Sequence, residues 1–173
     1  MRRLMLLRHA KAVPQGNMAD EERPLAVRGR RDTPLVGKFA VSRGLVPDLA
    51  LVSSSVRTRE TWELFAAAFA SPPPHRLEPR LYSTPAERIL ELARAVSGKV
   101  RTLLLVGHNP GFEDLARQLT AAGETDALIR FGGSMPTASL ALIELPGDWA
   151  TIQPRTGRME IFVTPKSLGG EDD

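Results

Sequence analysis

The chain lacks cysteine, has few aromatic residues and contains no long apolar run. The absence of cysteine excludes a disulfide framework, a thiolate metal site and a nucleophilic thiol. No apolar run approaches the roughly 18 residues of a membrane span. Arg2-Arg3 followed by only four apolar residues does not make a secretory signal. We therefore expect a cytoplasmic protein that has no membrane partner.

Arginine carries most of the positive charge, with 19 Arg against 4 Lys and a net charge of +3. The planar guanidinium binds phosphate in a bidentate manner, so this bias suits a phosphorylated ligand. The base composition of the source genome would produce the same bias. Only arginines at particular positions are therefore evidence for a phosphate site. Because the arginines are scattered and aromatic content is 5%, we expect no nucleic-acid partner.

The length of 173 residues fits one domain with its own apolar core. We expect a single domain over residues 1–165. The remaining residues 166–173 end in glycines and acidic residues and are expected to form a mobile tail.

A short apolar run, Leu4 to Leu7, ends directly on Arg8-His9. The run predicts a buried strand. In α/β proteins, ligands bind outside the carboxyl ends of such strands. Taken alone, the dipeptide is equally compatible with the start of an ordinary loop.

Strand and helix patterns alternate along most of the chain. Strands are predicted over 48–52, 75–77 and 102–106, and helices over 25–43, 56–69, 84–96 and 112–119. Pro34 either kinks the first helix or begins a second piece, and Thr84 is the predicted N-cap of the third helix. The alternation predicts a three-layer α/β sandwich with a mainly parallel central sheet and helices on both faces.

The C-terminal third has weaker patterns. Ala122 to Pro136 is rich in glycine and is expected to be a loop, and Thr137 to Leu145 is expected to be a strand. Trp149–Ile152 and Met159–Val163 are expected to pair as a closing hairpin.

Two further basic residues follow strands of the predicted sheet. His108 comes after the strand 102–106, and Arg57 lies in a helix's first turn, where its charge opposes the helix dipole. The carboxyl ends of parallel strands share a rim, so Arg8, His9, Arg57 and His108 are predicted to converge. Two guanidiniums and one imidazole can hold a phosphate dianion while the other imidazole attacks phosphorus. This chemistry needs neither metal nor cofactor.

Four blocks of the sequence, in the same order, resemble the histidine phosphatase superfamily and, more narrowly, its SixA-type phosphohistidine phosphatases. The blocks are Leu6–Ala12, Arg23–Leu25 with Arg28-Gly29, Ser53–Thr58 with Thr61-Trp62, and Val106–Pro110. The resemblance implies a phosphoglycerate mutase-like fold and a phosphoenzyme mechanism. It implies that His9 is the nucleophile and that Arg8, Arg57 and His108 bind the phosphoryl group.

Two residues beside these motifs have open roles. Asn109 either orients His108 through a hydrogen bond or belongs to an ordinary turn before Pro110. Lys11 either steers an anionic substrate toward the site or is a solvated loop charge.

The sequence also departs from the superfamily. Ala10 stands where glycine is usual, although the SixA-type branch tolerates alanine. Pro79 stands where mutase-like members carry a glutamate general acid, and Glu78 is one place away. An alkoxide leaving group needs such an acid, whereas an imidazole leaves with a pKa near ~6.5. Alkyl phosphates are therefore predicted to be poor substrates.

The expected function is a metal-independent phosphatase that acts through a phosphohistidine at His9. The expected substrate is phosphohistidine on a protein such as a phosphotransfer domain or a phosphocarrier. One alternative is a phosphatase for a small activated phosphate or anhydride. Another is a non-catalytic phosphate-recognition module.

Overall fold

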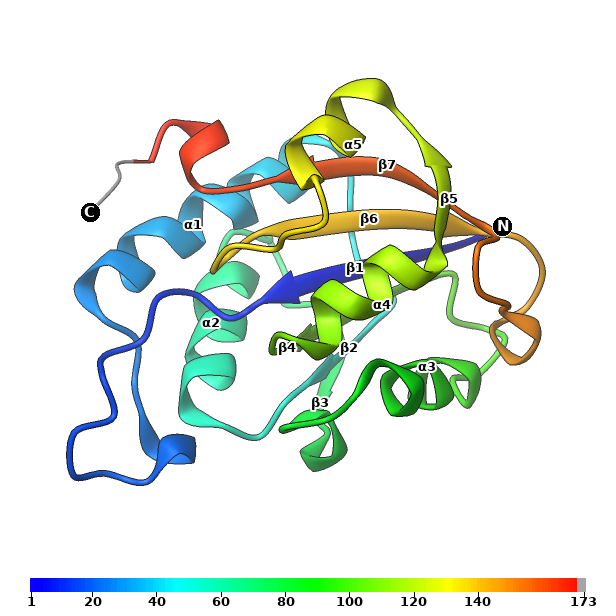
Figure 1. The fold of residues 1–173 in the computed structure, drawn as a ribbon. Helices are drawn as coiled ribbons and strands as arrows, with labels where there is room; N and C mark the ends of the chain where they lie inside the picture. The colour runs from blue at the N-terminus through cyan, green and yellow to red at the C-terminus, as the bar shows by residue number, and fades with distance from the viewer. Residues whose placement is uncertain (171–173) are drawn as a thin grey trace.

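A seven-stranded mixed sheet runs through the protein in the computed structural model, which describes residues 1–170 (Figure 1). The strand order is β3-β2-β4-β1-β6-β7-β5. The strands are β1 (Arg2–Arg8), β2 (Leu49–Val52), β3 (His75–Leu77), β4 (Thr102–Gly107), β5 (Thr120–Gly123), β6 (Leu140–Leu145) and β7 (Gly157–Val163). Among the described strands, β6 pairs antiparallel with β1 and β7, and the other pairs are parallel. The predicted mainly parallel sheet is confirmed.

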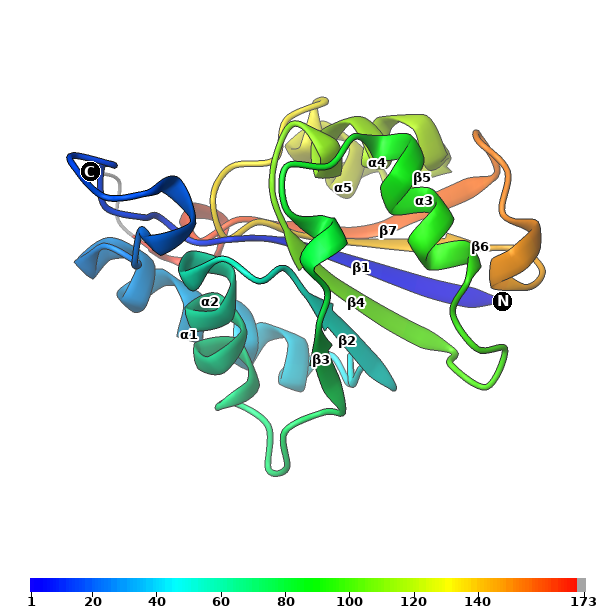
Figure 2. The same ribbon diagram turned by 90° about the horizontal axis from the view of Figure 1, so that it is seen from below.

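Helices cover both faces of the sheet. They are α1 (Val27–Ser42), α2 (Val56–Ala66), α3 (Ala86–Arg94), α4 (Gly111–Leu119) and α5 (Thr125–Phe131). Figure 2 shows α1 and α2 on one face and α3, α4 and α5 on the other. Short 3-10 turns η1 (Asp20–Glu22), η2 (Pro79–Leu81), η3 (Trp149–Thr151) and η4 (Lys166–Leu168) connect these elements. The predicted three-layer α/β sandwich is therefore confirmed.

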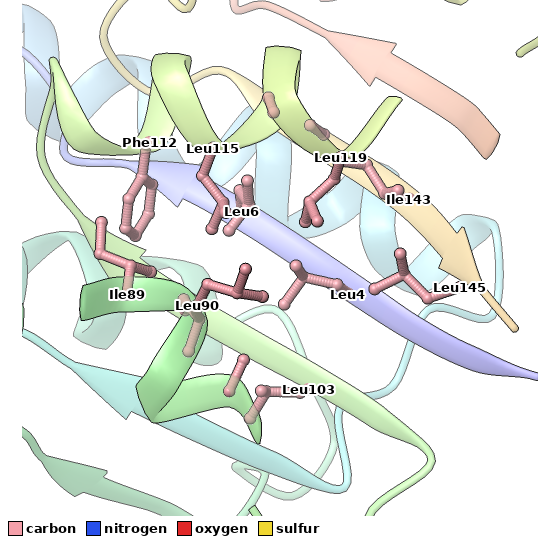
Figure 3. Close-up of a cluster of buried hydrophobic side chains, with 14 of the residues drawn as sticks. Leu4, Leu6, Ile89, Leu90, Leu103, Phe112, Leu115, Leu119, Ile143 and Leu145 are labelled. Carbon is pink, nitrogen blue, oxygen red and sulfur yellow. The ribbon is translucent and has the colours of Figure 1, made fainter. Parts of the chain in front are cut away.

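Alternation along β1 divides the core in two. Leu4 and Leu6 belong to the apolar cluster under α3 and α4, where Figure 3 shows Leu6 beside Leu115. Met5 and Leu7 belong to the cluster under α1 and α2. β4 lies between β1 and β2, parallel to both and buried along its whole length.

Several predicted boundaries change. A single helix, α1, runs through Pro34 without a break into two pieces. α2 ends at Ala66. Pro85, and not Thr84, occupies the N-cap of α3. The hydroxyl of Thr84 instead lies within hydrogen-bond distance of the carbonyls of Arg80 and Tyr82 and so closes the preceding turn.

The prediction for the C-terminal third is partly wrong. Ala122 to Pro136 is not a loop, because β5 pairs with β7 and α5 follows it. Trp149 to Thr151 form η3 and not a hairpin strand, because the Trp149 indole is buried and donates to the carbonyl of Val100 at 2.6 Å. β7 pairs with β6 and β5 instead.

The predicted mobile tail lies partly outside the described residues, since 171–173 are not described. Lys166–Leu168 form η4, and Leu168 packs against the core cluster under α1 and α2. None of the helices in residues 1–170 is both long enough and apolar enough to cross a membrane.

Candidate active site

A cavity of about 200 Å³ opens beyond the carboxyl ends of β1 and β4. In the parallel register of these strands Arg8 lies opposite Gly107, so the next residues of the two strands, His9 and His108, become neighbours. Their ring centroids are 5.3 Å apart. The residues that line the cavity are His9, Asp20, Arg57, Tyr82, Ser83, His108 and Asn109.

His9 is held in the form that a nucleophile requires. Its ring Nδ1 lies 2.8 Å from the carbonyl of Ala10. Because a carbonyl only accepts, Nδ1 carries the hydrogen and Nε2 keeps its lone pair. The residue is 8% exposed, and burial lowers the pKa of His9 to about 3. The imidazole is therefore neutral at pH 7.

His108 has the opposite tautomer. Its Nδ1 faces Nη2 of Arg57 at 3.5 Å, and a guanidinium only donates. Nε2 therefore carries the hydrogen and donates to Oγ of Ser53 at 2.8 Å. Burial, followed by the charge of Arg57, lowers the pKa of His108 to about 4.

Arg57 is positioned by the start of α2. Ser55 is the N-cap of this helix, and Arg57 follows in its first turn. Nη1 of Arg57 donates to the backbone carbonyl of Asp20 at 2.7 Å, and Nη2 donates to Oδ2 of Asp20 at 2.9 Å. Its Nε is buried and has no hydrogen-bond partner among the described residues.

Arg8 lies beside the cavity and is not among its lining residues. Nη1 donates to the carbonyl of Met135 at 3.0 Å, and Nε is buried without a partner in the described structure. The charge of Arg8 contributes to the lowered pKa of both His9 and His108. An unsatisfied buried donor costs about 1–3 kcal/mol. Arg8 and Arg57 thus each keep one guanidinium nitrogen that no hydrogen bond within the described residues uses.

Asp20 and Tyr82 meet at the mouth of the cavity. The hydroxyl of Tyr82 donates to Oδ2 of Asp20 at 2.5 Å, and Nη1 of Arg23 donates to Oδ1 at 2.9 Å. These hydrogen bonds hold the pKa of Asp20 well below its ordinary value, and the bond to Asp20 raises the pKa of Tyr82. The Tyr82 ring also contacts His108 edge-on, with centroids 5.4 Å apart.

Asn109 lines the cavity, but its amide is occupied by the turn before α4. Nδ2 donates to Oε2 of Glu113 at 2.8 Å and to the carbonyl of Met135 at 2.9 Å. Oδ1 accepts from the backbone N–H of Glu113 at 3.2 Å. These contacts support the interpretation of Asn109 as a turn residue and do not involve His108.

Lys11 has an exposed side chain that is not among the residues lining the cavity. Its backbone carbonyl accepts from the N–H of Ala26 at 2.9 Å. Gly29 of α1 lies so close to this carbonyl that a Cβ at position 29 would overlap it. The glycine of the Arg28-Gly29 motif therefore lets α1 approach the segment that follows His9.

Glu78 does not line the cavity. Its carboxylate binds Arg80 in a bidentate manner, with Nε to Oε1 at 2.8 Å and Nη2 to Oε2 at 2.9 Å. The hydrogen bonds from Arg80 lower the pKa of Glu78, which opposes the protonated form that a general acid requires.

Sequence reasoning did not single out three residues of the site: Asp20, Ser53 and Tyr82. Ser53 begins a run of three serines before α2, and its position directly after β2 places it on the rim. Tyr82 is the only tyrosine of the chain and follows β3, the outermost strand of the same rim. Asp20 lies in a polar loop, where nothing in the local pattern distinguishes it from Glu21 or Glu22.

Within residues 1–170, no group of three or more histidine, aspartate or glutamate side chains is arranged to hold a metal ion. The chemistry that the site presents comes from two neutral imidazoles, two guanidiniums and one carboxylate.

Comparison with known proteins finds relatives with this fold. No protein-family model matches the chain. A protein of Agrobacterium tumefaciens assigned as a phosphohistidine phosphatase SixA has a similar structure, with a TM-score of 0.77, 28% identity and coverage of 95% of this chain and 99% of that chain. The chain is therefore similar to the SixA-type members of the histidine phosphatase superfamily. Its fold is the phosphoglycerate mutase-like sandwich that the sequence predicted.

Further proteins match most of the chain. The protein histidine phosphatase SixA complexed with tungstate matches this SixA-type fold with a TM-score of 0.77 and 21% identity, over 96% of this chain and 99% of that chain. An uncharacterized protein of Mycobacterium tuberculosis is 33% identical over 92% of this chain and all of that protein. An uncharacterized chloroplastic protein of Arabidopsis thaliana is 32% identical over 96% of this chain and 79% of that protein.

Proposed function

We propose that the protein is a metal-independent phosphatase that removes the phosphoryl group from phosphohistidine on a partner protein, through a covalent intermediate on His9. The observation that carries the proposal is the state of His9: buried, neutral, and with a free Nε2 lone pair in a cavity lined by Arg57 and His108. The SixA-type relatives favour this substrate class.

The reaction has two steps. The lone pair on Nε2 of His9 forms a bond to phosphorus as the bond to the leaving nitrogen breaks and its electron pair departs with that nitrogen. Water then attacks phosphorus, the bond to Nε2 breaks with its pair returning to His9, and inorganic phosphate leaves. Arg8, Arg57 and His108 bind the phosphoryl oxygens, whose charge they stabilise.

The state of the carboxylates supports an activated leaving group. Asp20, the carboxylate that lines the cavity within the described residues, has a lowered pKa and is ionised at neutral pH. Glu78 is bound to Arg80 away from the cavity lining. An imidazole leaving group, with a pKa near ~6.5, needs little help from an acid, whereas an alkoxide needs a proton.

The size of the cavity supports a protein substrate. Its volume of about 200 Å³ lies below the roughly 300–1,000 Å³ of pockets that enclose a drug-sized ligand. The cavity can take a phosphoryl group and a small ring, while the rest of the substrate lies outside. A side chain projecting from a protein surface fits that requirement.

The test compares wild type with His9→Ala on a phosphohistidine-containing protein and on 3-phosphoglycerate, pyrophosphate and p-nitrophenyl phosphate, all with a chelator present. We expect wild type to release phosphate from phosphohistidine and to form an acid-labile phosphoryl adduct, and the variant to do neither.

Three results would contradict the proposal. Loss of activity with the chelator would contradict the metal-free mechanism. Efficient turnover of 3-phosphoglycerate would contradict the preference for activated leaving groups. Phosphate binding without release in wild type, retained in His9→Ala, would indicate a recognition module.

A further inference from the structure

We propose that Asp20 selects substrates with nitrogen leaving groups, because its carboxylate accepts a hydrogen bond from the ring N–H of the departing imidazole. This inference rests on the proposed function and assigns a specificity-determining residue to it. Three features of the structure carry it: the place of Asp20 in the cavity, its unfilled acceptor capacity, and its charge.

Asp20 lies at the open end of the cavity. Its side chain is 37% exposed, whereas His9 in the same cavity is buried. In a phosphoryl transfer the attacking and leaving atoms lie roughly in line on opposite sides of phosphorus. With the nucleophile at the buried end, the leaving group lies at the mouth, where Asp20 and Tyr82 are.

The carboxylate of Asp20 retains capacity for one more hydrogen bond. An ionised carboxylate offers about four lone-pair sites. Arg23 occupies one on Oδ1, and Arg57 and Tyr82 occupy two on Oδ2. The same three contacts fix the orientation of the carboxylate. A substrate N–H can therefore bind Oδ1 without displacing any of these donors.

The hydrogen bonds to Asp20 do not use every nitrogen of the Arg57 guanidinium. Arg57 uses Nη1 and Nη2 for Asp20, while its Nε remains buried and without a partner in the described residues. Asp20 thus occupies the two terminal nitrogens of Arg57, and the residue still lines the cavity beside His9 and His108. The guanidinium links phosphate binding to leaving-group recognition.

The charge of Asp20 distinguishes between leaving groups. A departing alkoxide or phenolate gains negative charge beside the carboxylate and is repelled. A phosphoimidazole protonated on its second ring nitrogen instead presents a positively charged N–H. When the bond from phosphorus to nitrogen breaks, its electron pair neutralises the ring, which leaves as imidazole with that N–H still bound to Asp20. No further proton is required in this step.

The experiment measures kcat/KM of the full-length protein for phosphoimidazole and for p-nitrophenyl phosphate, and compares their ratio among variants. In Asp20→Asn the ratio is expected to fall about 10- to 100-fold, the range for a hydrogen bond to a charged group. The rate on p-nitrophenyl phosphate is expected to rise, because the repulsion of the phenolate is removed. Asp20→Glu, which retains the charge, is expected to recover part of the ratio.

Glu21→Gln is the matched control, because Glu21 is an exposed carboxylate in the same turn that does not line the cavity. Its ratio is expected to equal that of wild type. A parallel fall on both substrates in Asp20→Asn would show that Asp20 only positions Arg57 and would overturn the inference. An equal change of the ratio in Glu21→Gln would overturn it too, because any negative charge in this turn would then account for the preference. Wild type that hydrolyses p-nitrophenyl phosphate but not phosphoimidazole would overturn the proposed function itself.

Discussion

Acidification from pH 7 to pH 5 is expected to destabilise the fold through its two buried histidines. The pKa of His9 is lowered to about 3 and that of His108 to about 4, whereas an imidazole in the unfolded chain has a pKa near ~6.5. Between these values the unfolded chain binds protons that the folded protein does not. Stability is therefore full above about pH 6.5 and falls as the pH drops below it.

The magnitude follows from linkage. Each histidine is expected to reduce the free energy of unfolding by about 2 kcal/mol between pH 7 and pH 5, so the pair reduces it by about 4 kcal/mol. The pKa of Asp20 is also lowered, but from an ordinary value of ~4. Its contribution to the free energy of unfolding is therefore lost only below about pH 4. Between pH 7 and pH 5 the change in stability therefore reports the two histidines and not this carboxylate.

Urea denaturation at the two pH values measures this difference. His9→Gln and His108→Gln each remove one titrating group, so each variant is expected to show about half of the wild-type pH dependence. If both variants kept the full wild-type dependence, the two histidines would not be the neutral, buried groups that the proposed mechanism requires.

Three further substitutions test other parts of the structure. Ser53→Ala leaves the Nε2–H of His108 without its acceptor and is expected to lower kcat/KM about tenfold, within the range for an unsatisfied buried donor; steady-state kinetics on the phosphohistidine substrate measures this. Gly29→Ala places a Cβ against the carbonyl of Lys11 and is expected to lower the free energy of unfolding by about 1–3 kcal/mol in urea denaturation. Glu78→Gln is expected to leave kcat unchanged, and a large fall would show that Glu78 is the general acid.

The first two thirds of the fold could be predicted because each element carries its signal locally. β4 is apolar at every position, and α4 has apolar residues at helical spacing on one face. The short strand β5 has no such signal, since Thr120 to Gly123 are half-buried or exposed and contain two alanines. It is a strand only because β7 lies beside it, and that neighbour is distant in sequence.

The same division applies to the site. His9 and His108 follow strong strand signals, and the parallel pairing of those strands brings them together. Asp20 reaches the cavity through a loop that an isolated bridge between Ala12 and Leu25 closes, and through its bonds to Arg57 and Tyr82. Those contacts join residues 37 and 62 positions apart, which no local pattern encodes.

The arginines proposed to bind a phosphate dianion also contribute to keeping the histidines of the site neutral. In the proposed reaction, a bound dianion offsets the charges of Arg8 and Arg57 and so makes protonation of His108 easier. His108 then gains a hydrogen on Nδ1 that it can donate to a phosphoryl oxygen, while its Nε2–H stays on Ser53. His9 keeps its Nε2 lone pair, because the attack on phosphorus uses that nitrogen and the carbonyl of Ala10 holds the other. The partners of the two rings thus determine which histidine attacks and which one binds.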